Sequence, residues 1–149
     1  MLQTIRTTYE HTGFRKLVQE LDRYLAVIDG SEHDFYHQYN HVDQLQHVVV
    51  LMENEQAMGC GAIKAIEPGV MEVKRMYTLP LARGKGIASR VLTELEAWAA
   101  ELGYTRCVLE TGRRMTDAVS LYRSRGYHEI PNYGPYIGID NSICFEKQL

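Results

Sequence analysis

The stretch Arg83-Gly84-Lys85-Gly86-Ile87-Ala88 combines two glycines with two cations, directly before a segment of helical pattern. Backbone N–H groups at the start of a helix point outward, and the helix dipole favours an anion there. Glycines let the backbone approach a phosphate without a Cβ atom in the way. The loop therefore predicts a phosphate or pyrophosphate site, with a flexible helix-capping turn as the alternative. Its spacing is neither that of a P-loop nor that of the GxGxxG dinucleotide fingerprint.

Two carboxylates stand in stretches that are otherwise apolar. Glu72 lies between two hydrophobic neighbours, and Glu110 ends the apolar run that begins at Cys107. A carboxylate in the middle of a buried strand is unusual unless it is paired or takes part in chemistry. Either group can bind a cation or accept a proton as a general base. For Glu72 the alternative is an ion pair with Lys74, Arg75 or a neighbouring strand.

Three histidines, His33, His37 and His41, are spaced so that a helix would place them on one face. That spacing leaves a metal site open as a minor alternative, but no acidic or cysteine ligand set completes it. The three cysteines lie in separate apolar runs without CxxC spacing, which favours buried thiols in a reducing compartment. We therefore expect no metal.

Composition is that of an ordinary soluble protein. The chain has 149 residues, of which 45% are hydrophobic and 23% charged, and its formal net charge is −3. A general nucleic-acid binder would normally carry a basic face, and no apolar run reaches membrane-spanning length. The N-terminus lacks the apolar segment of a signal peptide. We expect a single domain over residues 1–149, cytoplasmic, with no nucleic-acid or membrane partner.

The pattern of apolar residues predicts the elements that position these groups. β-branched and apolar runs indicate strands, and recurrence every three to four residues indicates helices ended by glycine. The expected strands are 3–9, 47–52, 57–66, 70–79, 106–111 and 142–146, and the main expected helices are 14–28, 86–102 and 116–125. Residues 31–45 are expected to form a short helix and a loop. The order predicts a mixed α/β (α+β) domain, antiparallel early and with a parallel crossover late.

Two motifs in this order resemble the GNAT superfamily of acyl-CoA-dependent N-acyltransferases. The family motif Gln/Arg-x-x-Gly-x-Gly/Ala is met by Arg83, Gly86 and Ala88, and residues 118–127 are similar to the segment A-x-x-L-Y-x-x-x-G-F/Y. The resemblance is strongest over residues 57–128, and the element order extends it to the whole chain. It implies the GNAT fold, a central, mixed and mostly antiparallel sheet that is splayed into a V at its parallel strands and flanked by helices.

The resemblance also implies how the acyl donor is held. In such enzymes a β-bulge opens the V, and the pantetheine arm lies in that opening. Backbone groups of Met76, Tyr77 and Thr78 would bind the acetyl carbonyl and the pantetheine amides. The pyrophosphate would lie on the backbone N–H groups of Gly84, Lys85, Gly86, Ile87, Ala88 and Ser89, beside the side chain of Arg83. Acetyl-CoA is thus the expected cosubstrate.

Catalytic roles follow from the same resemblance. Tyr122 is the tyrosine of the L-Y-x-x-x-G segment, which usually faces the thioester sulfur, so it is the expected acid for the CoA thiolate; the alternative is a packed aromatic side chain. Glu72 precedes Arg83 by eleven positions, the offset of the catalytic glutamate in the histone acetyltransferase branch, and is the expected base. Glu110 would end the other arm of the V and is the second candidate, with a water chain as a further option.

Three arginines near these groups keep more than one interpretation. Arg75 either pairs with Glu72 or Glu110 or binds a substrate carboxylate. Arg113 and Arg114 either contact the 3′-phosphate or the substrate, or are solvated loop charges.

Two segments would wall the acceptor site in the GNAT architecture. One is the histidine- and tyrosine-rich stretch 31–41, and the other is the loop Pro131–Tyr136. Tyr133 and Tyr136 in that loop alternatively pack on the domain surface or across a dimer.

The sequence therefore predicts an N-acetyltransferase, monomeric or homodimeric. It would transfer an acetyl group from acetyl-CoA to a primary amine of a small molecule or peptide by direct attack in a ternary complex. The alternatives are a non-catalytic CoA-binding sensor or interaction module on the same fold, and a mononucleotide-binding α/β regulator. Amino acids, polyamines, aminoglycosides and protein N-termini all remain open as acceptors, because loops select the acceptor.

Overall fold

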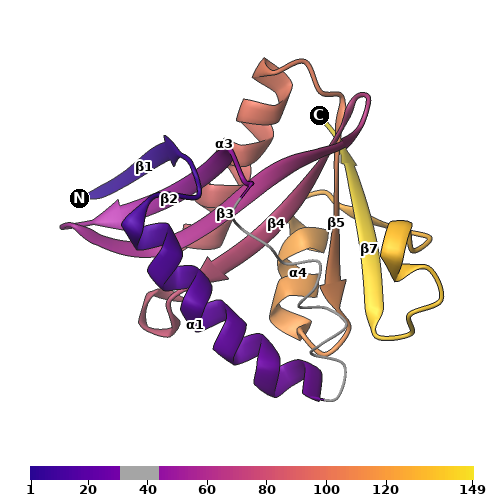
Figure 1. The fold of residues 1–149 in the computed structure, drawn as a ribbon, viewed down its shortest axis with the longest axis horizontal. Coiled ribbons are helices and arrows are strands. Elements are labelled where there is room, and N and C mark those ends of the chain that lie inside the picture. The colour runs from indigo at the N-terminus through magenta and orange to yellow at the C-terminus, as the bar shows by residue number, and fades with distance from the viewer. Residues whose placement is uncertain (31–43) are drawn as a thin grey trace.

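The computed structural model describes residues 1–30 and 44–149 of the chain. In chain order its elements are β1 (Leu2–Thr7), α1 (Thr12–Asp29), β2 (His47–Glu53), β3 (Gln56–Glu67), β4 (Val70–Thr78), the 3-10 helix η2 (Pro80–Ala82), α3 (Ile87–Glu101), β5 (Arg106–Gly112), α4 (Thr116–Ser124), β6 (His128–Ile130), the 3-10 helix η3 (Gly134–Tyr136) and β7 (Ser142–Gln148). The strands form one sheet in the order β1-β2-β3-β4-β5-β7-β6 (Figure 1). β4 and β5 pair in parallel, whereas the other described neighbours pair antiparallel.

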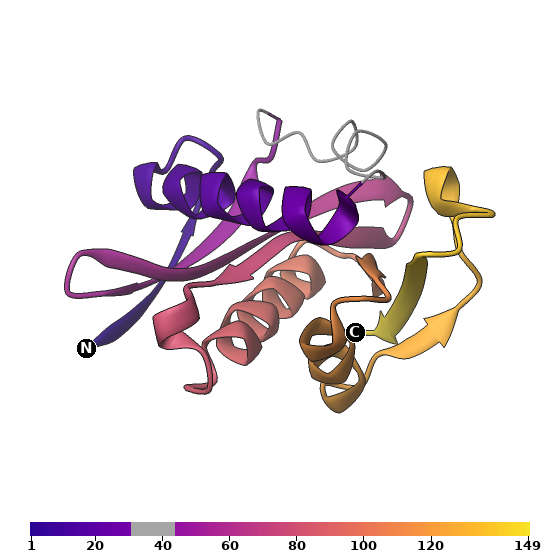
Figure 2. The ribbon, with the colours of Figure 1, turned by 90° about the horizontal axis from the view of Figure 1, so that it is seen from below.

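Different helices cover the two faces of the sheet (Figure 2). α1 lies over one face, and α3 and α4 lie over the other. The core on the α1 side is formed by Phe14, Leu17, Val18, Leu45, Val48, Val50, Cys60 and Ala62. The core on the α3 side includes Val49, Leu51, Ile63, Met71, Val73, Ile87, Val91, Leu92 and Leu95. Successive residues of β2 thus alternate between the two cores, and burying each aliphatic side chain contributes ~1.5–3 kcal/mol.

Two glycines of β3 let α3 pack directly on the sheet. A Cβ atom built on Gly59 would lie 2.5 Å from Cγ2 of Ile87, and one on Gly61 would lie 2.9 Å from Cδ1 of Leu95. Real Cβ atoms do not approach neighbours so closely, so larger residues at these positions would push the helix away. The close packing fixes the start of α3, and with it the glycine loop that precedes the helix.

A bulge in β4 and the divergence of β4 from β5 produce the expected V. Cys60 of β3 pairs with Tyr77, but Ala62 pairs with Lys74, so β4 carries one extra residue in this stretch. The extra residue introduces a backbone φ of 58° at Arg75. Pairing between β4 and β5 is confined to residues 70–72 of β4 and 106–108 of β5. Beyond that point the two strands separate, which opens the sheet.

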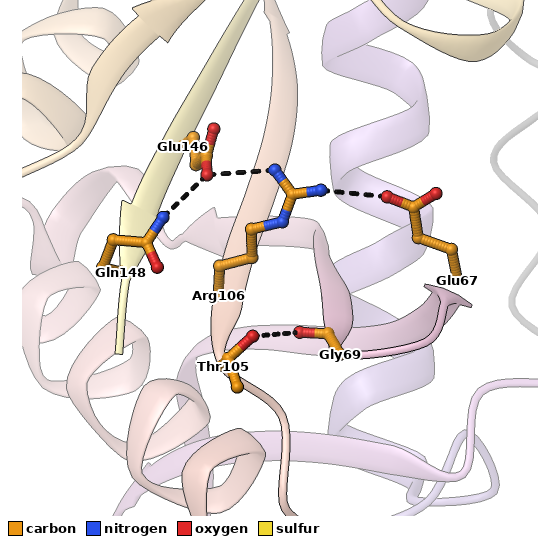
Figure 3. A network of polar contacts seen from close by, with 6 residues as sticks. All are labelled: Glu67, Gly69, Thr105, Arg106, Glu146 and Gln148. Atoms are coloured by element: carbon orange, nitrogen blue, oxygen red, sulfur yellow. Dashed lines mark hydrogen bonds and ion pairs between the residues drawn. The ribbon is translucent and has the colours of Figure 1, made fainter.

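The closed end of the V is held by polar contacts around Arg106 (Figure 3). Its guanidinium donates to Oε1 of Glu146 and to Oε1 of Glu67, both over 3.0 Å. The hydroxyl of Thr105 donates to the carbonyl of Gly69 over 3.2 Å. These contacts tie the β3–β4 turn to β5 and β7. The pair with Glu67 is exposed and contributes at most about 1 kcal/mol, so its main effect is on geometry.

The expected architecture is confirmed, with three small elements that the sequence pattern did not indicate. β6, η2 and η3 have three residues each, too few to show a periodicity. The histidine segment from His33 to His41 lies outside the described residues. Within residues 1–30 and 44–149, every helix falls short of the combined length and apolar character that crossing a bilayer requires.

Candidate active site

The glycine loop has the backbone conformation that its glycines permit. Gly84 has φ 81° and Gly86 has φ 75°, in the left-handed region that other residues rarely adopt. A Cβ atom on either glycine would meet nothing within 4 Å, so the space outside the loop is open. Arg90 donates its N–H to the carbonyl of Gly86 over 3.1 Å, one helical turn on. Residues 87–89 form the first turn of α3, where backbone N–H groups have no acceptor within the helix.

Arg83 is held across the end of β4. Its Nε donates to the carbonyl of Thr78 over 3.2 Å. Its guanidinium lies over the rings of Tyr24 and Tyr77, with the carbon 5.9 and 5.8 Å from the two ring centroids. The cation is therefore positioned at the mouth of the opening between α1 and the loop.

Six of the residues expected to bind the donor line one cavity of about 350 Å³, here called the loop cavity. These six are Met76, Tyr77, Thr78, Arg83, Gly84 and Ala88. Lys85, Gly86, Ile87 and Ser89 are not among its lining residues, although they belong to the same loop and the first turn of α3. The cavity is completed by α1, by the start of α4 and by Arg114 in the turn before α4.

A second cavity of about 110 Å³ lies in the opening of the V, between α1 and α4. Its lining includes three carboxylates, Asp29, Glu72 and Glu110, and we call it the acidic cavity. It shares its wall with the loop cavity through Leu21, Met76, Met115, Ala118 and Tyr122. The two cavities are therefore adjacent, and the expected acid lies in the wall between them.

Tyr122 is buried in an aromatic cluster and is 6% exposed. Its ring lies edge-on to Tyr127 at 5.8 Å and tilted against Phe145 at 6.3 Å. Burial raises the pKa of the Tyr122 hydroxyl, and the charge of Glu110 raises it further. The hydroxyl therefore stays protonated at neutral pH, which suits a proton donor.

Glu72 is buried and both of its oxygens are engaged. Oε2 accepts a hydrogen bond from the hydroxyl of Tyr133 over 2.5 Å, and Oε1 lies 3.3 Å from Nζ of Lys74. Of the ion pairs expected for this carboxylate, the structure contains the one with Lys74. The bond from Tyr133 could not be read from sequence, because the two residues are 61 positions apart.

Glu110 is half-buried and lies on β5 across the opening from Lys74. The hydroxyl of Ser142 donates to its Oε2 over 2.7 Å. Burial raises the pKa of the Glu110 carboxyl to about 7, and the charges of Glu72 and Asp29 add to the shift. A carboxyl with this pKa gains and loses a proton near neutral pH, as a general base requires.

Arg75 pairs with neither of the carboxylates expected for it. One of its terminal nitrogens lies 2.5 Å from Oδ1 of Asp22 on α1, and its side chain is only 2% exposed. The expectation of an ion pair with Glu72 or Glu110 is therefore wrong. The left-handed backbone at Arg75 turns this side chain toward α1 instead of along the strand.

Sequence reasoning missed the two acidic residues that α1 contributes. Asp22 holds Arg75, and Asp29 lines the acidic cavity while being 6% exposed. Asp29 lies at the end of α1, where a negative charge opposes the helix dipole. The unfavourable position of this acidic residue could have been noticed in the sequence, and it indicates that Asp29 has a role other than stabilising the helix.

The remaining arginines and tyrosines lie around the site. Nε of Arg113 donates to the carbonyl of Asp140 over 2.8 Å, and Arg114 donates to the carbonyl of Ile28 over 3.1 Å. The rings of Tyr133 and Tyr136 pack edge-on at 5.9 Å, and Tyr136 lines the acidic cavity. The part of the chain that the structure describes contains no group of three side chains that could ligate a metal.

Comparisons with known proteins agree with this geometry. The model of the acetyltransferase (GNAT) family matches residues 13–127. The chain is 35% identical over 142 residues to the IAA acetyltransferase of Azospirillum brasilense, covering 90% of this chain and 89% of that protein. It is 32% identical over 113 residues to the uncharacterized N-acetyltransferase YjgM of Escherichia coli, covering 73% of this chain and 66% of that protein.

Solved structures share the whole fold. A Klebsiella pneumoniae protein described as an acyl-CoA N-acyltransferase superposes with a TM-score of 0.84 at 28% identity, covering 100% of this chain and 98% of that chain. The PaiA N-acetyltransferase of Thermoplasma acidophilum, solved in complex with coenzyme A, superposes with a TM-score of 0.73 at 16% identity, covering 100% and 99%. With the family model spanning most of its length, the chain belongs to the GNAT family and is an N-acetyltransferase.

Proposed function

We propose that the protein transfers an acetyl group from acetyl-CoA to a primary amine by direct attack in a ternary complex. The observation that carries the proposal is the shared wall of the two cavities. Met76 and Tyr122 line both the loop cavity and the acidic cavity. A thioester at this wall would be open to donor contacts on one side and to an amine on the other.

The loop cavity suits the donor. The open backbone at Gly84 and Gly86 and the N–H groups that start α3 would bind the pyrophosphate. The end of β4, from Met76 to Thr78, would bind the pantetheine arm and the acetyl carbonyl. The coenzyme A complex of the Thermoplasma relative supports this choice of donor.

The acidic cavity suits the head of an amine acceptor. Three carboxylates line it against the two cations Lys74 and Arg75, and the charge of Arg75 is already compensated by Asp22. A protonated amine is attracted to such a site. Its volume of about 110 Å³ fits a small head group rather than a bulky one.

Glu110 and Glu72 would have different roles in the reaction. Glu110 would take one proton from the ammonium, and the neutral nitrogen would attack the carbonyl carbon of the thioester. The carbon–sulfur bond then breaks and Tyr122 donates its proton to the leaving thiolate. The nitrogen gives up its second proton, which restores Tyr122, and Glu110 releases its own to water. Glu72, with both oxygens engaged, would orient the ammonium.

The test is thiol release from acetyl-CoA with a panel of primary amines, together with CoA binding measured by calorimetry. We expect CoA to bind and at least one amine to release thiol in step with its acetylation. CoA binding without thiol release from any amine would instead identify a non-catalytic CoA sensor.

A further inference from the structure

A third hollow, here called the side groove, lies beyond Glu72 from the opening of the V and has a volume of about 530 Å³. Its floor is made by residues of β3, β4 and β5, and the segment Tyr133–Tyr136 forms one wall. Three residues, Glu72, Lys74 and Tyr136, line both the side groove and the acidic cavity. The acidic cavity and the side groove therefore adjoin at these three residues.

The junction of the two spaces presents opposite charges close together. Nζ of Lys74 lies 3.3 Å from Oε1 of Glu72, and Glu110 faces the same opening from β5. An α-amino acid carries its ammonium and its carboxylate on one carbon atom. Lys74 would attract the carboxylate of such a molecule, and the neighbouring carboxylates Glu72 and Glu110 would attract its ammonium.

The charges around the two spaces follow the same polarity. The acidic cavity is lined by Asp29, Glu72 and Glu110, whereas Lys64, Lys74 and Arg106 line the side groove together with Glu67 and Glu72. Arg106 is bonded to Glu67 and Glu146, so Lys64 and Lys74 are the cations that bear on a ligand there. A polyamine would place its second ammonium among these cations. A protein N-terminus carries no carboxylate next to its amine.

The side groove is apolar beyond these charges. Its apolar lining residues are Ile66, Val70, Val108 and Ile130, together with the aromatic residue Tyr133. Burial of an aliphatic side chain against such a surface is favourable, because it removes apolar area from water.

We propose that the acceptor is an α-amino acid with an apolar side chain. Its ammonium lies at Glu110, its carboxylate at Nζ of Lys74 and its side chain in the side groove. The inference rests on the proposed function, since it names the substrate class of the same site.

Three amines with the same branched body test the carboxylate: leucine, leucinamide and 3-methylbutylamine. We expect kcat/KM to be at least about tenfold higher for leucine than for either analogue, because only leucine places a carboxylate at Lys74. Amine basicity cannot place leucine above leucinamide. The amine of leucinamide stands beside an amide group and has a pKa of about 7.7–8.0, far below the ~10.4 of an alkyl amine. Leucinamide is therefore easy to deprotonate, and basicity alone would favour it.

Variants assign the preference to Lys74. In Lys74→Gln the leucine-to-leucinamide ratio of kcat/KM should fall to within about twofold, and Lys74→Arg should retain most of it. Lys16→Gln removes the same charge from an exposed position of α1 and should leave the ratio unchanged. Because the readout is a ratio within one variant, a general loss of activity does not affect it.

A second pair, leucine and alanine, tests the side groove. The wild type should prefer leucine, and Ile130→Asp should reduce that preference while keeping the preference for leucine over leucinamide. Equal use of leucine and leucinamide by the wild type, an unchanged ratio in Lys74→Gln, or a wild type that prefers alanine would each overturn the inference. If leucinamide or 3-methylbutylamine is acetylated as well as leucine, the proposed function stands and only this inference fails. If CoA binds but no amine releases thiol, both fail.

Discussion

The hydroxyl of Tyr133 donates to one oxygen of Glu72 over 2.5 Å, while Lys74 occupies the other oxygen at 3.3 Å. A carboxylate engaged on both sides is poorly placed to collect a proton from a substrate. Glu110 accepts a hydrogen bond from Ser142 at one of its oxygens, and burial raises the pKa of its carboxyl to about 7. The two carboxylates are thus suited to different tasks, although the resemblance to the histone acetyltransferase branch made Glu72 the expected base.

The pH dependence of the reaction should report Glu110. Its carboxyl must be ionised to accept a proton, so kcat/KM should rise as the pH increases through about 7 and then level off. In Glu110→Gln the amine has to arrive already neutral. The variant should be slower and should keep rising toward the pKa of the amine, near ~10.4 for an alkyl amine. Parallel pH profiles for the two proteins would assign the proton to another group.

Tyr122→Phe should lower kcat by about 10²-fold or more, because the CoA thiolate loses its proton donor. The Phe ring keeps the packing against Tyr127 and Phe145, so the affinity for CoA should stay within about twofold. Tyr127→Phe is the matched control. It removes a hydroxyl that bonds Glu96 over 2.9 Å outside both cavities, and it should leave kcat near the wild-type value. Equal turnover of Tyr122→Phe and wild type at every pH would rule out the acid role.

Gly86→Val should weaken CoA binding at least about tenfold by calorimetry, because a β-branched residue does not adopt φ 75° without strain. Gly103 offers a control at the other end of α3, with φ 92° and equally open space. Gly103→Val should lose comparable stability but retain CoA affinity. Similar affinity losses in both variants would mean that α3 responds to general destabilisation, and that the loop has no special role.

Asp22→Asn should destabilise the protein by about 2–4 kcal/mol in chemical denaturation, because it leaves the guanidinium of Arg75 buried without its carboxylate. The exposed pair of Arg123 with Glu129 gives the comparison. Glu129→Gln should cost less than about 1 kcal/mol, as solvent screens that pair. A loss for Asp22→Asn as small as that for Glu129→Gln would show that water reaches Arg75.

Features coded by neighbouring residues were predictable from sequence. The β2–β3 hairpin follows from two apolar runs around a polar turn, and α3 follows from its periodicity and the glycine at 103. Contacts that depend on how α1 crosses the sheet were not predictable. Arg75 lies 53 positions from Asp22, and no local pattern selects that partner over nearer carboxylates. The different hydrogen-bond partners of Glu72 and Glu110 likewise depend on Tyr133 and Ser142, which the C-terminal loop and strand bring in.

The bulge at Arg75 also reverses which side of the sheet each residue of β4 faces. Before it, Met71 and Val73 face the α3 core, so odd-numbered positions point that way; after it, Met76 packs there and Tyr77 packs on the α1 side. The one extra residue thus changes which of the odd- and even-numbered positions of β4 face the α3 core. Regular pairing that kept Arg75 but lost the bulge would send Tyr77 into the α3 core and Met76 toward α1, whereas deleting Arg75 would leave both side chains on their present faces. An alignment that overlooks this insertion would assign both residues to the wrong layer of the molecule.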